Sequence, residues 1–186
     1  YSDWEGALFK KGYQQDYNLS ASGGNQNSNF IGSLGYTKQT GVSINSEMER
    51  FTGRVDANNK YKRVEFGMSA TFSWTKNVHI PEGKFYGSAI YAAKVNLTPS
   101  TPIYNEDGTY ASGFRENNGY NPLLEASVND YYARTARTMG TAKIAYNIWD
   151  NLKVSSVFTV DYSLTKDFFF QSPEGRDGAT YQGRGR

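Results

Sequence analysis

The most constraining feature of this sequence is a stretch in which every second residue is apolar. From Val64 to Thr75 the even positions are all apolar, and the odd positions are all polar or glycine. Successive side chains of a β-strand point to opposite faces of a sheet, so this alternation indicates a strand with one apolar and one polar face. At a content of 38% hydrophobic residues, chance gives such a pattern in only about 2 of 10,000 windows. The alternation therefore predicts a β-strand.

Five further stretches show the same alternation less strictly. The clearest runs from Leu152 to Ser163, where only Ser156 and Val157 interrupt it. Aromatic residues make up 16% of the chain and glycine contributes 19 residues, a composition that favours an all-β fold. The strands expected in this antiparallel sheet lie near residues 14–22, 29–37, 50–58, 63–76, 134–148 and 152–167.

The expected strands are long enough to cross a membrane. Twelve residues at about 3.3 Å each extend roughly 40 Å, which still projects to about 28 Å at a tilt of 45°. Strands of soluble proteins average about half that length. The mean hydropathy of −0.68 does not contradict this, because strands that alternate between lipid and lumen look polar on average. We therefore expect the strands of a transmembrane β-barrel.

The connections between these strands alternate in length. Short turns are expected at Gly23–Ser28, Asn58–Arg63 and Trp149–Asn151, and longer loops lie between them. In outer-membrane barrels the short turns are periplasmic and the long loops are extracellular. The expected parts are a lead-in segment (1–13), four strands (14–76), a long extracellular loop (77–132), two further strands (133–170) and the start of the next extracellular loop (171–186).

The alternation also separates the residues expected on the two sides of such a wall. Those expected to face lipid are Val64, Phe66, Met68, Phe72, Trp74, Ile144, Tyr146, Phe158, Val160 and Tyr162. The polar residues expected to face the lumen are Arg54, Asp56, Glu65, Lys143, Lys153 and Asp161. Amphipathic aromatic rings prefer the depth of the lipid headgroups. This preference fits Trp74 at the outer end of its strand, and Tyr146 and Trp149 at the periplasmic end of theirs.

The long segment 77–132 holds the candidate ligand-binding residues. Its aromatic side chains suit stacking on sugar rings or gripping a peptide, and the alternative is that they pack the loop against a neighbouring domain. These candidates are Tyr104, Tyr110, Phe114 and Tyr120. Within the same segment, Tyr86–Asn96 is expected to form a short helix or a strand over the barrel mouth, and Glu106–Gly108 a turn rather than a calcium loop.

Catalysis, metal binding and cofactor binding are not expected. The chain has no cysteine and His79 is its single histidine. Sites that require a thiolate or several histidines are therefore excluded, and a histidine-based catalytic triad is not expected. The acidic residues are scattered and the serine and threonine hydroxyls have no nearby general base. A formal net charge of +2 gives no reason to expect nucleic acid as a partner.

Several stretches, in order along the chain, resemble the barrel of SusC/RagA-like TonB-dependent outer-membrane transporters. The first three are DYNLSASGG (Asp16–Gly24), NFIGSLGYTKQTGV (Asn29–Val42) and SEMERFTGRVDAN (Ser46–Asn58). Before them stands SDWEGALFKKG, and after them TPIYNEDGTYA, NPLLE and FTVDYSLTKDFFF. The resemblance implies a 22-stranded barrel with a plugged lumen, of which about six strands lie in this chain.

The same resemblance implies the setting and the partners. It places the protein in the outer membrane of a Gram-negative, Bacteroidetes-type bacterium, as an importer of glycans or peptides. The implied partners are outer-membrane lipid, the rest of the same barrel and its plug, a SusD-like surface lipoprotein, and TonB through an N-terminal part expected outside this stretch. Most of the lumen-facing charges are then expected to contact the plug. The chain opens without a signal peptide and without a plug domain, so we expect a mature or internal piece of a longer polypeptide.

Two other interpretations remain open from the residues alone. One is a small, complete eight-stranded barrel with a structural or adhesive role, which needs two more strands from the region 84–116. The other is a soluble β-sandwich that serves as a binding module, in which the apolar face of Val64–Trp74 packs on a second sheet. A sandwich stays monomeric in plain buffer, whereas a barrel depends on detergent.

Overall fold

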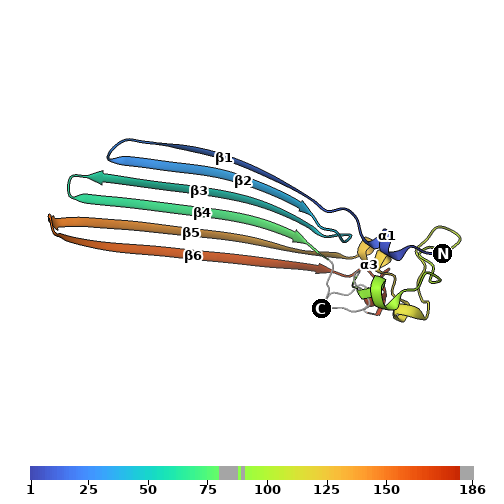
Figure 1. Cartoon of the computed structure of the whole chain (residues 1–186). Helices are drawn as coiled ribbons and strands as arrows, with labels where there is room; N and C mark the ends of the chain where they lie inside the picture. Colours follow the sequence, from blue (N-terminus) through green and yellow to red (C-terminus); the bar gives the residue numbers. More distant parts are fainter. Residues whose placement is uncertain (80–87, 89–90, 181–186) are drawn as a thin grey trace.

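The structure is a computed structural model that describes residues 1–79, 88 and 91–180. Its main feature is one long, open antiparallel sheet (Figure 1). The strands lie side by side in chain order: β1 (Tyr13–Gly24), β2 (Ser28–Thr40), β3 (Glu47–Tyr61), β4 (Val64–Val78), β5 (Asp130–Trp149) and β6 (Leu152–Phe170). The expected all-β fold with six long antiparallel strands is confirmed.

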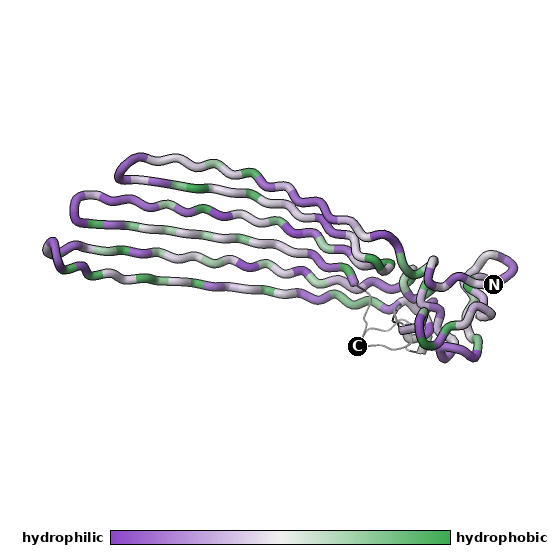
Figure 2. The backbone as a smooth tube through the Cα atoms, in the orientation of Figure 1, coloured by the Kyte–Doolittle hydropathy of each residue, from purple (hydrophilic) through white to green (hydrophobic). Residues whose placement is uncertain are grey.

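The strands extend beyond the ranges that alternation predicted. They run from 12 residues in β1 to 20 in β5, and β5 begins at Asp130 rather than near residue 134. Figure 2 shows polar and apolar residues interspersed along the strands. The added residues are mostly charged or aromatic, and they sit at strand ends, where alternation is no longer visible in the sequence.

Three tight turns lie together at one end of the sheet, which we call the turn end (Figure 1). In the β1–β2 turn, the Asn25 side-chain oxygen accepts hydrogen bonds from the backbone N–H groups of Asn27 and Ser28, both at 2.9 Å. Lys62, in the β3–β4 turn, has a positive φ of 53°, as two-residue hairpin turns require. These short connections fall where the sequence predicted them.

The opposite end, which we call the loop end, carries a compact cluster of short helices. They are α1 (Trp4–Leu8), η1 (Ala92–Asn96), η2 (Glu116–Gly119), α3 (Pro122–Val128) and α4 (Arg176–Thr180). Trp4 and Leu8 are buried at the centre of the cluster. Around them pack Phe9, Ile44, Ala93, Leu97, Ile103, Leu123 and Ala126. The lead-in segment therefore belongs to this cluster rather than to the sheet.

Side chains with several hydrogen bonds fix the segments of the cluster to one another. The Trp4 indole N–H donates to the Thr101 carbonyl oxygen at 3.0 Å, across 97 residues of sequence. Asn121 caps α3 by accepting from the backbone N–H groups of Leu123 and Leu124. Its amide also donates to the carbonyl oxygens of Ile103 and Ala111, both at 2.9 Å. Because Asn121 is only 1% exposed, these bonds are shielded from water.

The region expected to cover the barrel mouth is helical where it is described. Helix η1 occupies Ala92–Asn96. The rest of the expected element 86–96 and the segment before it lie partly outside the described residues, because residues 80–87, 89 and 90 are not described. From 91 to 129 the chain forms helices, turns and one isolated bridge between Tyr104 and Tyr110. That stretch adds no strand to the sheet, so the described residues do not supply the extra strands of a complete eight-stranded barrel. Among the described residues, no helix is long and apolar enough to cross a membrane.

Candidate functional site: the two faces of the sheet

One face of the sheet, which we call the apolar face, gathers all ten residues expected to face lipid. The register pairs Val64 with Tyr146 and Phe66 with Ile144, and β6 continues the same face. Most of these side chains are exposed in this chain, with Phe158 the most exposed of the ten at 68%. A continuous exposed apolar surface of this extent is typical of an interface with lipid or with another protein.

A row of aromatic rings crosses the first four strands of the apolar face near the loop end. Tyr17, Tyr36, Phe51 and Trp74 lie opposite one another in register on β1 to β4. Successive ring centroids are 6.4, 4.7 and 5.9 Å apart. At the turn end of the same face lies a second aromatic group, Tyr61, Tyr146 and Trp149. The apolar face is therefore bounded by amphipathic rings at both ends.

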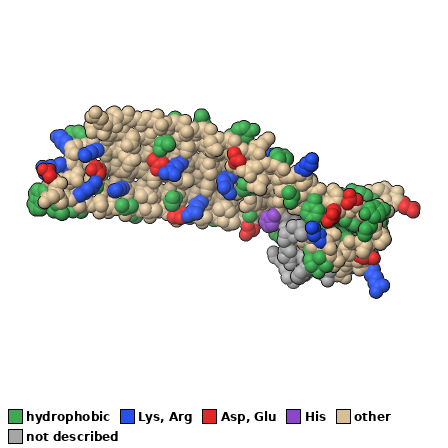
Figure 3. Space-filling model, in the orientation of Figure 1, with side chains coloured by type: hydrophobic (Ala, Val, Ile, Leu, Met, Phe, Trp, Pro, Cys, Tyr) green, Lys and Arg blue, Asp and Glu red, His purple; other side chains and the backbone are tan. Residues whose placement is uncertain are grey.

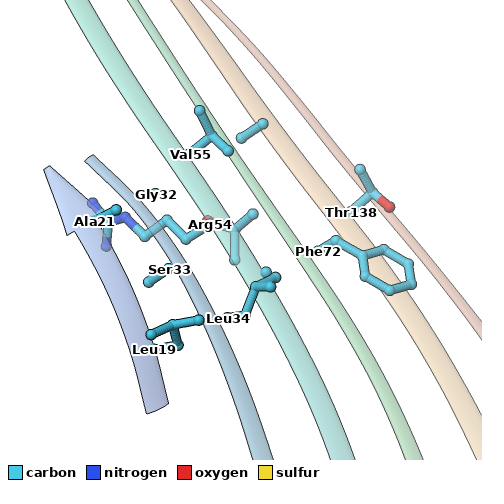
Figure 4. A pocket seen from close by; sticks show the side chains of 12 residues that line it. Leu19, Ala21, Gly32, Ser33, Leu34, Arg54, Val55, Phe72 and Thr138 are labelled. Atoms are coloured by element: carbon cyan, nitrogen blue, oxygen red, sulfur yellow. The ribbon is translucent and has the colours of Figure 1, made fainter. Parts of the chain in front are cut away.

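Small residues produce a shallow apolar depression between the two aromatic groups. Gly32, Gly53 and Ala70 replace large side chains at neighbouring positions, and Leu19, Leu34 and Phe72 stand at its margins (Figure 4). Its volume is about 510 Å³. A second hollow of about 720 Å³ continues it toward Tyr17, Tyr36 and Phe51. The shape and the apolar lining suit hydrocarbon chains more than a polar substrate.

The opposite face, which we call the polar face, carries the six residues expected to face the lumen. Arg54 pairs with Asp56 along β3. Lys153 on β6 reaches across β5 to Glu65 on β4, above Ala145, which is 1% exposed. Figure 3 shows acidic and basic side chains lying beside one another over the sheet. Within the described part of the chain, Lys143 forms no ion pair.

The sixth charged residue, Asp161, has a partner that alternation did not identify. Arg137 donates from Nε and Nη2 to the two carboxylate oxygens of Asp161, which is a bidentate pair across β5 and β6. Arg137 has the same parity as Lys143 in β5, and this was the signal available in the sequence. It was missed because Ala136, Thr138 and Gly140 are small or polar, so the alternation is not visible there.

Uncharged polar side chains join neighbouring strands on the same face. Thr135 bonds to Thr165 at 3.0 Å and Thr141 to Thr159 at 3.2 Å, between β5 and β6. Asn58 donates to Asn29 at 3.1 Å between β2 and β3. The polar face thus consists of paired charges and hydrogen-bonded side chains. Among the described residues of this face, no acid, base and nucleophile are grouped in a catalytic arrangement.

The four aromatic loop candidates do not form one site. Tyr104 and Tyr110 stack with ring centroids 5.2 Å apart, and Tyr104 is 54% exposed. Tyr120 instead lies under the Arg176 guanidinium at 5.6 Å, and Phe114 is half-buried. Among the described residues, Tyr104 and Tyr110 are the only two of these four side chains whose rings contact each other.

The turn between these two tyrosines holds no ion-binding arrangement. Asp107 accepts hydrogen bonds from the Thr109 hydroxyl and backbone N–H, and Gly108 has a positive φ of 83°. Those bonds, the hydroxyl first, hold the pKa of Asp107 below its usual range. The described residues contain no group of three side chains placed to bind a metal ion. Asp107 thus closes a turn.

No family model matches the sequence, but individual proteins do. TonB-dependent receptor P3 of Formosa agariphila is 30% identical over 165 residues, which are 84% of this chain and 16% of that protein. TonB-dependent receptor SusC of Bacteroides thetaiotaomicron is 28% identical over 111 residues, covering 59% of this chain and 11% of that protein. The chain thus spans less than a fifth of the curated relatives that it matches.

The fold agrees with these sequence matches. A chain of the RagAB peptide importer in its closed-closed state superposes on 94% of this chain with a TM-score of 0.77 and 18% identity, over 20% of its own length. The open-open state gives 0.76 over 92% of this chain and 20% of that chain, with 19% identity. The open sheet therefore has the fold of part of that barrel. The expected resemblance is confirmed: the chain matches part of a SusC/RagA-like TonB-dependent receptor.

Proposed function

We propose that this chain forms part of the barrel wall of a TonB-dependent outer-membrane importer. The carrying observation is that one register places apolar residues on one face and paired polar residues on the other, over strands of membrane-crossing length. From Val64 to Trp74 the apolar face runs about 33 Å at 3.3 Å per residue. Tilted by about 40°, that length matches the apolar band of about 25 Å on outer-membrane barrels.

The apolar face lies against lipid in this proposal, with its two aromatic groups at the two interfaces. Aromatic girdles flank the lipid-facing band of such barrels. The depression around Gly32 and Gly53 then receives acyl chains. The loop end is the extracellular end, because its connections are long and the three turns at the other end are short.

The polar face lines the lumen in this proposal and packs mainly against the plug domain. Arg54–Asp56, Glu65–Lys153 and Arg137–Asp161 already pair within the wall. A plug that packs on these three pairs, or withdraws from them, leaves each of their six charges with its partner, so both states avoid the cost of unpairing them. This arrangement suits a barrel wall that the plug covers at one stage of transport and that water reaches at another.

The two edges of the sheet support a larger barrel. Both β1 and β6 have one side that no other described strand pairs, and unpaired backbone groups are not tolerated in a bilayer. We propose that the remaining strands of the same barrel close both edges. A second sheet, as in a soluble sandwich, has no counterpart among the described residues.

The substrate and the partners follow the family. We propose import of glycans or peptides, with a SusD-like surface lipoprotein over the loop end and TonB acting through another part of the polypeptide. The solved structures that support the fold are of a peptide importer. The cluster around Trp4 and Leu8 offers a rigid platform for such a lid. The exposed Tyr104 and the half-buried Tyr110 that stacks on it are the candidates for ligand contact, and Phe114 and Tyr120 serve mainly to pack the loop.

The orientation of the wall can be tested by cysteine labelling, because the chain has no cysteine of its own. Met68→Cys, Ser69→Cys, Ala70→Cys and Thr71→Cys are introduced singly into the full-length receptor, in outer membranes, with any other cysteines removed. Ser69 and Thr71 should react with a small water-soluble maleimide wherever the plug leaves them open to water. Met68 and Ala70 should react only with a lipid-soluble maleimide. Equal reactivity at all four positions would contradict the proposal.

Import itself is tested with a strain that lacks the receptor gene. Growth is compared on defined oligosaccharides and peptides as the sole nutrient, with and without the intact gene restored on a plasmid. We expect a defect on at least one glycan or peptide, and we expect the same defect when TonB is absent. A receptor that leaves uptake of every tested nutrient unchanged would contradict an importer.

A further inference from the structure

A row of five charged residues crosses the apolar face just beyond the aromatic row. In register, Lys38 lies opposite Glu49, and Glu49 opposite Lys76. Lys76 in turn lies opposite Arg134, and Arg134 opposite Lys166. These residues come from five strands and span more than 120 positions of sequence, so only the register reveals the row. We call it the basic row.

Most of the positive charge of the basic row is unneutralised. Lys38 and Glu49 form an ion pair at 3.5 Å. Within the described part of the chain, no ion pair joins Lys76, Arg134 or Lys166 to a carboxylate. The nearest other acid of the same parity on β3 is Glu47, one row further out and opposite Thr40 and Val78. Three cations therefore stand side by side on β4, β5 and β6.

An aromatic platform positions two of these cations. The Lys76 ammonium lies 5.4 Å from the centroid of the Tyr132 ring, and the Arg134 guanidinium lies 4.8 Å from it. Tyr132 in turn stacks on Phe168, with ring centroids 4.8 Å apart. Two like charges on one ring repel each other, so an anion between them relieves the repulsion while the cation–π contacts keep both groups in place.

The position of the basic row along the strands indicates which anion it meets. Lys76 is two residues beyond Trp74 toward the loop end, which is about 7 Å along the strand. Amphipathic rings such as Trp74 mark the membrane interface, so the basic row lies at the depth of the outer headgroups. It also shares the face of Phe72 and Trp74 rather than the face of the lumen charges, and no imported substrate passes there.

We propose that Lys76, Arg134 and Lys166 bind the phosphate of an anionic lipid in the outer leaflet of the membrane. The inference rests on the proposed function, because it requires the apolar face to lie in lipid. Arginine presents a planar fork of donors that matches phosphate, and lysine adds point charges beside it. The acyl chains of the bound lipid lie along the apolar face below, next to the aromatic row.

The test uses the intact receptor in detergent, with bisphosphorylated lipid A as the probe and native mass spectrometry as the measure of affinity. The variant is Lys76→Gln with Arg134→Gln. Its control is Arg50→Gln with Lys143→Gln, which removes the same charge from the polar face; Arg50 lies at nearly the same height, opposite Thr37 and Thr75. At the usual contribution of a basic residue near a membrane surface, the variant should bind about 30-fold more weakly and the control unchanged.

Three further experiments distinguish lipid phosphate from free phosphate and loss of the site from misfolding. Lys166 is exposed and contacts no aromatic ring of the described residues. Lys166→Gln alone should weaken binding about fivefold and guards against a folding defect in the double variant. Dephosphorylated lipid A should bind weakly to the wild-type receptor. Equal binding by the double variant, equal binding of dephosphorylated lipid, or full displacement by millimolar inorganic phosphate would each overturn the inference.

The amount of each variant in purified outer membranes distinguishes a failure of the lipid-binding inference from a failure of the proposed function. If the wild-type receptor is inserted and imports while the double variant binds lipid A normally, only the lipid site is wrong. If the wild-type receptor is absent from the outer membrane, the proposed function and the lipid site are both wrong.

Discussion

At the scale of single residues, the direction of a side chain decides what a substitution does. Met68 and Ser69 are neighbours near the middle of β4 and point to opposite faces. Met68 belongs to the apolar face, between the two aromatic groups. Ser69 lies opposite Asp56 and Thr141 on the polar face. The pair therefore provides a matched comparison at one height.

Met68→Arg in the full-length receptor should lower the free energy of unfolding by about 2–4 kcal/mol, because arginine near the bilayer midplane of a barrel is costly. Ser69→Arg should be much milder, since its guanidinium finds the Asp56 carboxylate across the strand pair. The measurement is urea unfolding of the receptor refolded into lipid vesicles, followed by tryptophan fluorescence. Equal losses at the two positions would reverse the assignment of the faces.

At the scale of elements, the loop end depends on a few buried hydrogen bonds. Asn121 begins α3 and also binds the carbonyl oxygens of Ile103 and Ala111. Asn121→Ala should destabilise the loop cluster by about 2–3 kcal/mol, since it removes a helix cap and leaves buried carbonyl groups unpaired. Limited proteolysis and hydrogen exchange over 91–129 report the loss.

Ser127→Ala, on the exposed side of the same helix, serves as the control. Its hydroxyl donates only to the Leu124 carbonyl within α3, so protection of the loop should change little. Similar exchange rates in the two variants would show that Asn121 does not hold the segments together.

The turn that closes the Tyr104–Tyr110 bridge should depend on acid pH. Asp107 has a pKa below its ordinary 3.8 because the Thr109 hydroxyl and N–H donate to its carboxylate. The stabilisation is therefore present at neutral pH and is lost as the pH falls below 4 through the lowered pKa. Hydrogen exchange at Thr109 should lose protection in that window, and Asp107→Asn should be insensitive there. Protection that rises on acidification would contradict this assignment.

The elements differ in how far the sequence predicted them. The strand β4 and the turns around it were predictable, because strict alternation and short polar turns are local signals. The start of β5 was not, because Tyr131 and Tyr132 are aromatic on both faces. Arg137 was not predictable, because its small or polar neighbours hide the alternation there. The basic row was not predictable either, because Lys38, Lys76 and Lys166 come together only through the register of distant strands. Contacts such as Trp4 to Thr101 likewise join segments whose separation leaves no periodic signal.

At the scale of the whole molecule, the sheet leaves its apolar face and both of its edges uncovered by the described residues. Its apolar face exposes large side chains such as Phe30, Phe66 and Phe158. Its edges, β1 and β6, each leave a row of backbone N–H and C=O groups unpaired by the described residues. In the barrel wall that we propose, lipid covers the apolar face and neighbouring strands cover both edges.

Expressed alone without detergent, residues 1–186 should therefore form aggregates rich in β-structure instead of a monomer, because exposed edges pair with other copies and apolar faces associate. Size-exclusion chromatography with light scattering measures the outcome, and the full-length receptor in detergent provides the monodisperse reference. Adding detergent to the short chain should disperse the apolar contacts but leave edge pairing, so small oligomers should remain. A stable monomer in plain buffer would mean that the apolar face is covered within the chain itself. The lipid-facing wall, and the lipid site above it, would then both be wrong.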